Sequence, residues 1–327
     1  MKTVAPAPAG APRPPPRPPR MTLASVSAHR EPAPDRIFVM GVEGVGKSTF
    51  GRDAPHAVFL SSEDGIRHLD PQPAAFPEPE SWADVLEAVA TLATEKHAYR
   101  TLVLDTVDWL EPFAWQHVCQ ANQWDSIEAP GYGKGYTAAL DEWRRLIVGL
   151  DRARAAGMQV VLLAHAATRT VSPPDSDHDW TRYECKLHRG AAALLREWCD
   201  VCLFATYEQW AAKKKGSTRA KGVSSGRRVA YSQYSAAYDA KSRWPLPESF
   251  TFSWEEYAAA RASGGANQVG QLRAEVAELR GKIAVEGDQA KSLDAWIAKA
   301  GDDPARLRKV VDGLRGKVAE QAPGEEE

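Results

Sequence analysis

The sequence is poor in cysteine and has no long apolar run. Its 327 residues include only 4 Cys, namely Cys119, Cys185, Cys199 and Cys202. That number is too small and too scattered for a disulfide-stapled fold, and it favours a reducing, cytoplasmic setting. No run of about 18 apolar residues occurs, so we expect no membrane span. The N-terminus also lacks the apolar segment of a secretory signal.

The chain has no surplus of either charge. It carries 41 Lys and Arg against 43 Asp and Glu, for a formal net charge of −2. Contact with nucleic acid would therefore need a local basic patch, because the molecule as a whole is not a polycation. The hydrophobic share of 43% is ordinary for a folded protein and allows one large domain with appendages.

Strand patterns are missing from both ends of the chain. Residues 1–35 are rich in Pro, Ala and Arg, which predicts a disordered arm. Residues 263–327 are predicted to be helical, with a short heptad-like seam and an acidic tail. The seam consists of Val269, Leu272, Val276, Leu279 and Ile283, followed by Leu307, Val311, Leu314 and Val318. A helical hairpin that packs on itself and a helix that packs on a partner both fit this spacing.

Residues 36–262 alternate between apolar strands and amphipathic helices. Strands are predicted at 36–40, 57–60, 101–104, 159–164 and 201–206, and helices at 47–52, 81–94, 136–156 and 190–198. Apolar strands without polar alternation indicate an α/β fold with a mostly parallel sheet that is flanked by helices. Two further strands at 229–234 and 249–254 predict an antiparallel extension at the edge of this sheet.

A phosphate-binding pattern, G-x-x-x-x-G-K-[ST], follows the first strand. It comprises Gly41, Val42, Glu43, Gly44, Val45, Gly46, Lys47 and Ser48, with Thr49 after it. Glycines allow the positive φ angles with which consecutive N–H groups surround phosphate oxygens. Lys47 adds a point charge for the β and γ phosphates, and the Ser48 hydroxyl is a ligand for Mg²⁺. The motif therefore predicts ATP and Mg²⁺ as cofactors.

Three further polar residues follow other strands of the predicted sheet. Asp105 ends the strand at 101–104 and is expected to hold Mg²⁺ through water. Glu63, with Asp64 as its rival, follows the strand at 57–60 and is a candidate to activate water; either residue could instead cap a turn. His165 follows the strand at 159–164 and is a candidate sensor of the γ-phosphate, or it simply sits in a loop. The carboxyl ends of parallel strands share one edge, so we expect these side chains to meet there.

Six segments together resemble the RecA-like ATPases, most of all the phage-encoded branch of nucleotide-binding or single-strand annealing proteins. They are GVEGVGKST (41–49), LSSEDGIRHLDP (60–71), TLVLDTVDWLE (101–111), GYGKGY (131–136), VVLLAHA (160–166) and YDAKSRWPLP (238–247). The resemblance extends from about Arg36 to Tyr257. It implies that Glu63 is the catalytic base, whereas the sensor, commonly Gln in RecA itself, is His165 here.

The resemblance also implies partners. Lys241 and Arg243 are similar to a basic pair that reaches the ATP of the next protomer, which implies a ring or filament. Loops near 121–136 and 167–189 are the expected contacts for single-stranded DNA, where aromatic rings and cations alternate. The candidate DNA-binding cations are Lys134, Arg169, Arg182, Lys213, Lys214, Lys215, Arg219, Lys221, Arg227 and Arg228. A single-strand-binding or replication protein is a further expected partner, and no membrane is.

The expected function is an ATP-hydrolysing, Mg-dependent protein of DNA recombination or repair that binds single-stranded DNA and promotes annealing or pairing. A phage-encoded protein would act in the host cytoplasm. No RecA-type C-terminal domain is evident in the sequence, so full strand exchange is not expected. Two alternatives remain open: an ATP-liganded interaction module, and a helicase loader or motor ATPase of phage replication. ATP turnover with and without single-stranded DNA would separate them.

The spacing of Cys185, His188, Cys199 and Cys202 superficially offers four zinc ligands. However, Cys199 and Cys202 flank the start of an apolar strand, where successive side chains alternate between faces. Cysteine is also among the residues most often buried in protein cores. We therefore expect burial rather than metal binding.

Overall fold

The computed structural model describes residues 22–26, 33–172, 178–213, 220–263, 268–301 and 304–321. The chain divides into two compact units, Met1–Ala33 and Pro34–Glu327. In the first unit the described residues form a single 3-10 turn, η1 (Leu23–Ser25). The rest of the predicted N-terminal arm, the acidic tail, and Lys214, Lys215 and Arg219 lie outside the described residues.

Within the described residues, ten strands form one sheet in the order β10-β8-β7-β1-β5-β4-β2-β3, with β6 beside β5 and β9 beside β7. The strands are β1 (Arg36–Gly41), β2 (Ala57–Ser61), β3 (Ala74–Ala75), β4 (Thr101–Asp105), β5 (Gln159–Val171), β6 (Trp180–Cys185), β7 (Val201–Lys213), β8 (Ala220–Tyr231), β9 (Lys241–Ser242) and β10 (Ser249–Thr251). Neighbours from β7 to β3 run parallel, while β8, β10, β6 and β9 pair antiparallel. The predicted α/β fold with an antiparallel edge is confirmed.

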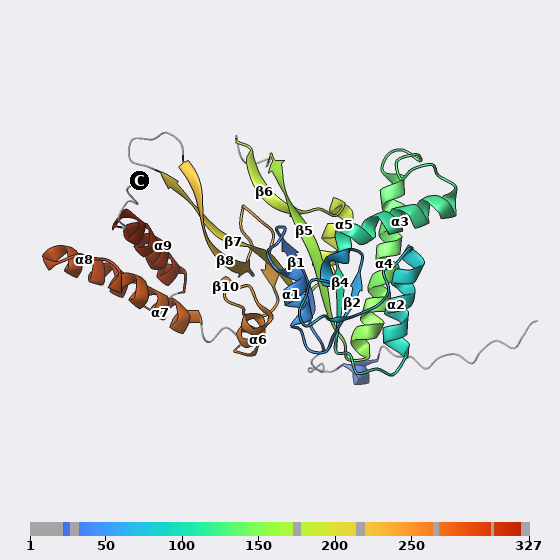
Figure 1. Ribbon diagram of the computed structural model, residues 1–327, viewed down its shortest axis with the longest axis horizontal. Coiled ribbons are helices and arrows are strands. Elements are labelled where there is room, and N and C mark those ends of the chain that lie inside the picture. The colour runs from blue at the N-terminus through green and yellow to red at the C-terminus, as the bar shows by residue number, and fades with distance from the viewer. Residues whose placement is uncertain are drawn as a thin grey trace, which may run out of the picture. The chain divides into compact units, whose positions relative to one another are not determined.

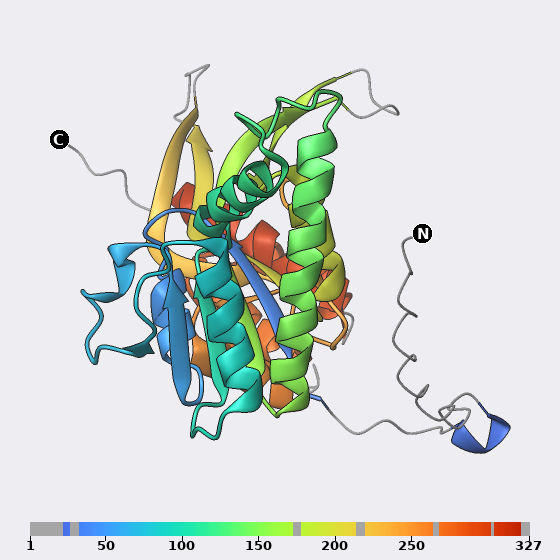
Figure 2. The same ribbon diagram turned by 90° about the vertical axis from the view of Figure 1, so that its right-hand side faces the viewer.

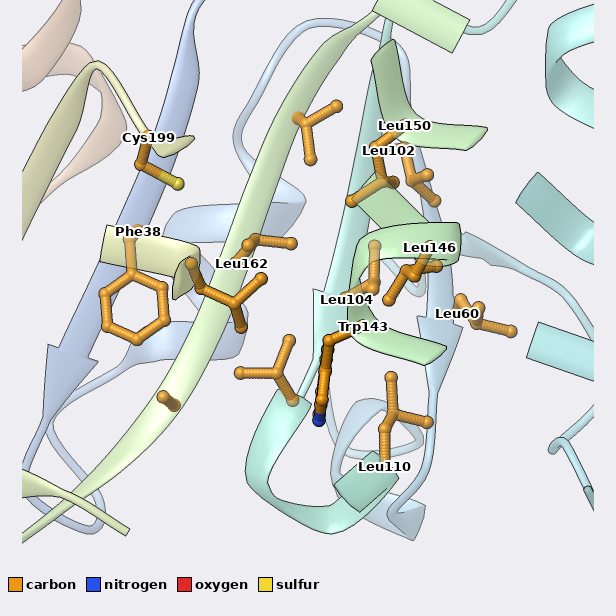
Figure 3. Close-up of a cluster of buried hydrophobic side chains, with 14 of the residues drawn as sticks. Phe38, Leu60, Leu102, Leu104, Leu110, Trp143, Leu146, Leu150, Leu162 and Cys199 are labelled. Carbon is orange, nitrogen blue, oxygen red and sulfur yellow. The ribbon is translucent and has the colours of Figure 1, made fainter. Parts of the chain in front are cut away.

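Helices cover both faces of the sheet (Figures 1 and 2). One face is covered by α2 (Trp82–Thr94), α3 (Val107–Asn122), α4 (Lys134–Ala155) and α5 (Arg189–Trp198), and the other by α1 (Lys47–Arg52) and α6 (Trp254–Ala262). Alternate residues of β1 enter the two cores: Phe38 faces the first set of helices and Ile37 the second. Figure 3 shows the first core, where Trp143 of α4 lies among leucines of the strands and helices.

Helix α3 was not among the predicted helices, and Pro112 lies inside it. Proline removes one backbone hydrogen bond from a helix interior and normally argues against a helix. Here Val107, Leu110, Ala114 and Val118 recur at helical spacing and are buried against the sheet. Tertiary burial therefore outweighs the local cost of the proline.

The strand predicted at 249–254 is only partly correct. β10 ends at Thr251, and α6 begins at Trp254. The Ser253 hydroxyl accepts a hydrogen bond from the Glu256 N–H at 3.2 Å, which caps the helix. The Ser-x-x-Glu spacing is a sign of a helix start that outweighs the apolar run before it.

An antiparallel hairpin, β5–β6, replaces the loop expected at 167–189, and a second hairpin, β7–β8, follows the last parallel strand. β5 continues beyond its pairing with β1 and pairs with β6 from Ala166↔Cys185 to Val171↔Trp180. Residues 220–228, which include the predicted DNA-binding cations Arg227 and Arg228, belong to β8, which pairs with β7. The edge strand predicted at 229–234 ends at Tyr231. The long pairs β5–β6 and β7–β8 both extend past the carboxyl ends of the parallel strands (Figure 1).

The C-terminal helices α7 (Gln268–Gly281), α8 (Gly287–Ala298) and α9 (Pro304–Gln321) have an apolar cluster of their own. Val276 and Ile283 of the first predicted seam are buried together with Leu307 and Leu314 of the second. The apolar residues of the two predicted seams therefore pack against each other within the chain, as in a helical hairpin. Among the described helices, none is long and apolar enough to cross a membrane.

The buried cysteines agree with the expectation of burial. Cys185, Cys199 and Cys202 are 4%, 0% and 2% exposed. Burial raises the pKa of Cys185 and of Cys202 to about 12, because a thiolate loses its hydration in the core. These thiols are therefore packing groups that stay protonated at neutral pH.

Candidate nucleotide site at the carboxyl edge of the sheet

The phosphate-binding loop connects the end of β1 to the start of α1. Gly41 pairs with His165 on one side and with Ala205 on the other, so the loop starts at the centre of the sheet. Gly44 and Gly46 have φ angles of 72° and 98°, which side-chain-bearing residues rarely adopt. Val45 between them is fully buried. The sequence thus folds into the tight glycine loop that phosphate binding requires.

Lys47 lies over this loop. Its side chain is buried, and the Nζ atom donates hydrogen bonds to the carbonyls of Gly41 at 3.3 Å and Val42 at 3.2 Å. Burial lowers the pKa of Lys47, and the nearby carboxylates of Asp105 and Asp108 oppose that shift. The structure therefore holds a cation at the loop with acidic groups close by.

Asp105 ends β4 on the same edge of the sheet. It lies opposite Ser61 of β2 and Leu163 of β5, and it is 5% exposed. Burial raises the pKa of Asp105, and a hydrogen bond from Ser48 opposes the rise. A buried carboxylate beside a hydroxyl offers the hard oxygen ligands that Mg²⁺ prefers. Ser48 and Asp105 therefore fit the predicted metal site, in which phosphates and water would supply the other ligands.

Glu63 is held at this edge by a neutral partner. The Thr106 hydroxyl donates to Glu63 Oε1 at 2.8 Å. The ends of β2 and β4 are also joined directly, because the Ser62 N–H donates to the Asp105 carbonyl at 3.0 Å. The candidate base is thus positioned next to the candidate metal ligand. The side chain of Asp64, its rival, lies outside the described part of the structure.

His165 is fixed by Asp108, a residue that sequence reasoning missed. Asp108 accepts hydrogen bonds from the His165 backbone N–H and from Nδ1, both at 2.9 Å. Burial opposes ionisation of Asp108, but the hydrogen bonds from His165 outweigh it and lower its pKa. His165 Nδ1 lies 3.9 Å from Glu63 Oε1. The signal for Asp108 was its place three residues after Asp105, in the first turn of the unexpected helix α3.

Glu111 lies one turn farther along α3, and no cation of the described residues forms an ion pair with it. It is 4% exposed, and its Oε2 atom accepts a hydrogen bond from the His188 N–H at 2.8 Å. Its Oε1 atom is buried and has no hydrogen-bond partner among the described residues. Burial raises the pKa of Glu111 to about 7, and the negative charge of Asp108 adds to the rise.

Three side chains from neighbouring elements contact the phosphate-binding loop. Lys186, just after β6, pairs with Glu43 at 3.2 Å, and this hydrogen bond lowers the pKa of Glu43. The Tyr207 hydroxyl of β7 donates to the Gly44 carbonyl at 2.8 Å. Arg228 of β8, predicted to bind DNA, lies against Gly46. The β7–β8 hairpin is therefore a wall of the nucleotide site.

Lys241 and Arg243 lie at the opposite, amino edge of the sheet. Lys241 is in β9, which pairs with the start of β7. Arg243 Nη1 donates to Asp200 Oδ1 at 3.1 Å, and both basic side chains donate to the Glu197 carbonyl. They are remote from the phosphate-binding loop of their own chain. A role at the site of a neighbouring protomer stays a prediction.

Of the other predicted DNA-binding cations, four have side chains that the structure describes: Lys134, Arg169, Arg182 and Arg227. Arg182 pairs with Asp239 at 2.5 Å and lies over the Tyr234 ring, and Arg227 donates to Thr251 Oγ1 at 3.2 Å. The guanidinium groups of Arg182 and Arg227 are therefore engaged within the chain. Lys134, at the start of α4, is exposed, and Arg169 is half exposed near Glu184. The side chains of Lys213 and Lys221 lie outside what the structure describes.

The sequence matches the model of one known protein family. The sequence model described as AAA domain matches residues 33–244, from just before β1 to just after β9. The match covers more than half of the chain and contains every residue of the site described above. No curated protein matches the chain.

Proposed function

Since the chain belongs to the AAA domain family and is a P-loop ATPase, we propose that it hydrolyses Mg-ATP as a RecA-like protein of DNA recombination or repair. In this proposal it binds single-stranded DNA and promotes annealing or pairing. The observation that supports hydrolysis is the convergence of Lys47, Ser48, Asp105 and Glu63 on one edge of the sheet.

Each residue has a distinct task in the proposed reaction. Lys47 and the loop amides hold the phosphates, while Ser48 and Asp105 hold the metal ion. Mg²⁺, when bound, neutralises charge that develops on the phosphate oxygens. The Glu63 carboxylate accepts a proton from the attacking water, and the Thr106 hydroxyl keeps that carboxylate in place. His165, held by Asp108, is positioned to respond to the terminal phosphate.

Matched variants test hydrolysis. Glu63→Gln should bind nucleotide like the wild type but lose about a hundredfold or more in turnover, because the amide cannot accept the proton. Asp64→Asn is the control and should keep turnover within a few fold. Lys47→Ala should lose both binding and turnover. Full activity of Glu63→Gln, or equal losses in both carboxylate variants, would refute the assignment of the base.

The DNA part of the proposal rests on the surface beyond the carboxyl edge. The hairpins β5–β6 and β7–β8 extend there, and Arg169 lies on the first of them. Lys134 starts α4, and the nearby Tyr132 ring is fully exposed. The Trp109 ring, in the first turn of α3, is 54% exposed. Exposed aromatic rings and cations beside the nucleotide site suit base stacking with phosphate contact.

A salt titration tests this surface. If Lys134 and Arg169 each meet one phosphate, Lys134→Ala/Arg169→Ala should reduce the slope of log K against log salt by roughly 0.7 per contact. The control is Lys96→Ala/Arg100→Ala, two exposed cations just before β4 at the amino edge. An unchanged slope in the first variant, or the same change in both, would reject this surface. Turnover stimulated by single-stranded DNA is expected in the wild type.

The shared-site part of the proposal places Lys241 and Arg243 at the ATP of a neighbour. Their position at the amino edge supports it, because a protomer stacked head to tail would present that edge to the next nucleotide site. Lys47→Ala and Lys241→Ala/Arg243→Ala should each be inactive alone. An equimolar mixture should regain part of the turnover. A mixture that stays inactive would contradict shared sites.

A further inference from the structure

Arg228 contacts the phosphate-binding loop directly. A Cβ atom placed on Gly46 would lie 2.8 Å from Arg228 Nη1 and 3.6 Å from Cζ. The guanidinium therefore occupies the space where any other residue at position 46 would carry its side chain. Gly46 is adjacent to Lys47 in the chain, so the loop has a second cation beside it.

The β7–β8 hairpin holds Arg228 in this position. In the ladder between β7 and β8, Arg228 lies opposite Tyr207, whose hydroxyl donates a hydrogen bond to the Gly44 carbonyl. The backbone carbonyl of Arg228 accepts a hydrogen bond from the Phe252 N–H at 3.0 Å. The register shifts between Tyr207 and Gln209. Such irregularities redirect side chains and recur near active sites. The backbone on both sides of Arg228 is thus fixed to the loop and to the sheet.

The charge of Arg228 is not neutralised within the described residues. Its side chain is exposed, and no described carboxylate pairs with it. The adjacent Arg227 points elsewhere and binds Thr251 Oγ1, and Glu43 of the loop is already paired with Lys186. Two cations at one loop repel each other unless an anion lies between them. An arginine fork is suited to a phosphate group, which accepts two parallel N–H bonds.

We propose that Arg228 is a phosphate ligand of the nucleotide site, supplied by the same chain that supplies the loop. Its guanidinium donates to phosphate oxygens of the nucleoside triphosphate on the Gly46 side. This inference rests on the proposed ATP site, and it gives Arg228 a role other than DNA contact. The β7–β8 hairpin then senses directly whether the loop holds a nucleotide.

Nucleotide affinity tests this role without any need for turnover. Titration calorimetry with ADP and with a non-hydrolysable ATP analogue, both with Mg²⁺, would compare the full-length wild type with Arg228→Gln, Arg228→Lys and Arg227→Gln. Loss of a charged hydrogen bond should weaken binding by about tenfold to a hundredfold in Arg228→Gln. Arg228→Lys keeps the positive charge but loses the two parallel N–H donors of the guanidinium. Its nucleotide affinity should lie between those of the wild type and Arg228→Gln. Arg227→Gln is the matched control and should stay within about twofold.

Chemical modification of the wild type gives a second readout that does not depend on how a variant folds. Phenylglyoxal modifies exposed arginines, and peptide mass spectrometry locates them. The bound analogue should protect Arg228 but not Arg227. Equal modification of Arg228 with and without analogue would overturn the inference.

The failures of the two proposals can be distinguished. Wild-type binding with unchanged affinity in Arg228→Gln overturns the role of Arg228 alone. Equal weakening in Arg227→Gln and Arg228→Gln also overturns it, because a general field effect would then account for both. A wild type that binds neither nucleotide overturns the proposed function, and the role of Arg228 with it.

Discussion

Asp105 and Asp200 lie at opposite ends of the central strands, and both are almost fully buried, at 5% and 4% exposure. Asp200, just before β7, accepts three hydrogen bonds from Arg36 and one from Arg243. Burial opposes its ionisation, but the bonds from Arg36 prevail and lower its pKa. Among the described residues no arginine pairs with Asp105, and burial raises its pKa.

The difference separates a structural charge from a binding charge. At the amino edge, the guanidinium groups of Arg36 and Arg243 neutralise the carboxylate of Asp200. At the carboxyl edge, Asp105 and Glu111 are buried with weaker partners, and the cations Lys47 and Arg228 lie at the same loop. Buried groups with shifted pKa values that converge in this way are typical of functional sites.

The largest expected effect is a loss of stability when Asp200 loses its charge. Asp200→Asn removes the main counterion of the partly buried Arg36, so we expect a loss of about 3–5 kcal/mol in the free energy of unfolding. The folded pKa of Asp200 is lowered, so its contribution is present above the unfolded value near 3.8 and is lost as pH falls through the folded pKa. Urea unfolding at several pH values measures it.

Asp105→Asn is the matched substitution at the other edge. The raised pKa means that the carboxylate form costs stability above that pKa, so the amide should leave the free energy of unfolding unchanged or increase it at pH 8 without nucleotide. Mg-dependent turnover should be lost. If Asp105→Asn destabilised the protein as much as Asp200→Asn, the two carboxylates would not differ in their contribution to stability.

Glu111→Gln tests the buried charge at the carboxyl edge through the pH dependence of stability. The folded chain binds a proton at Glu111 up to about pH 7, while the unfolded value is 4.5. The folded state then holds more protons between these values, so wild-type stability falls as pH rises through this window. Glu111→Gln removes that cost and should be more stable than the wild type by up to about 3 kcal/mol at pH 8, but not at pH 4.

The control for this prediction is Glu87→Gln, an exposed glutamate on α2. It should show no such pH-dependent difference from the wild type. A constant difference between Glu111→Gln and the wild type from pH 4 to pH 8 would show that Glu111 does not titrate in this range.

The same contrast explains what the sequence could predict. The phosphate-binding loop, Asp105 and Glu63 depend on short spacings next to apolar strands, so their meeting at one edge followed from the parallel order. Helix α3 was hidden by Pro112, and Asp108 and Thr106 were hidden with it. Arg228 could not be placed, because its contact with Gly46 joins two segments that are far apart in the sequence.

A smaller effect is expected where a neutral hydroxyl holds the candidate base. Thr106→Val keeps the shape of the side chain but removes its 2.8 Å hydrogen bond to Glu63. Turnover should fall about tenfold while nucleotide affinity stays unchanged, because only the position of the base is affected. Thr106→Ser retains the hydroxyl and should stay close to the wild type. Equal turnover in the Val and Ser variants would remove Thr106 from the site.

The smallest effect tests how the hairpin and the loop are joined. Tyr207→Phe removes only the hydroxyl that donates to the Gly44 carbonyl at 2.8 Å. One neutral, exposed hydrogen bond contributes about 0.5–1.5 kcal/mol, so nucleotide affinity should fall by a few fold while the free energy of unfolding changes little. In double-mutant form, Tyr207→Phe/Arg228→Gln should lose less than the sum of the single losses, because both residues act on the same loop through the same hairpin. If the losses of nucleotide affinity in the two single variants simply add up in the double variant, Tyr207 and Arg228 contact the loop independently. The groups at the carboxyl edge would then not be coupled through the hairpin.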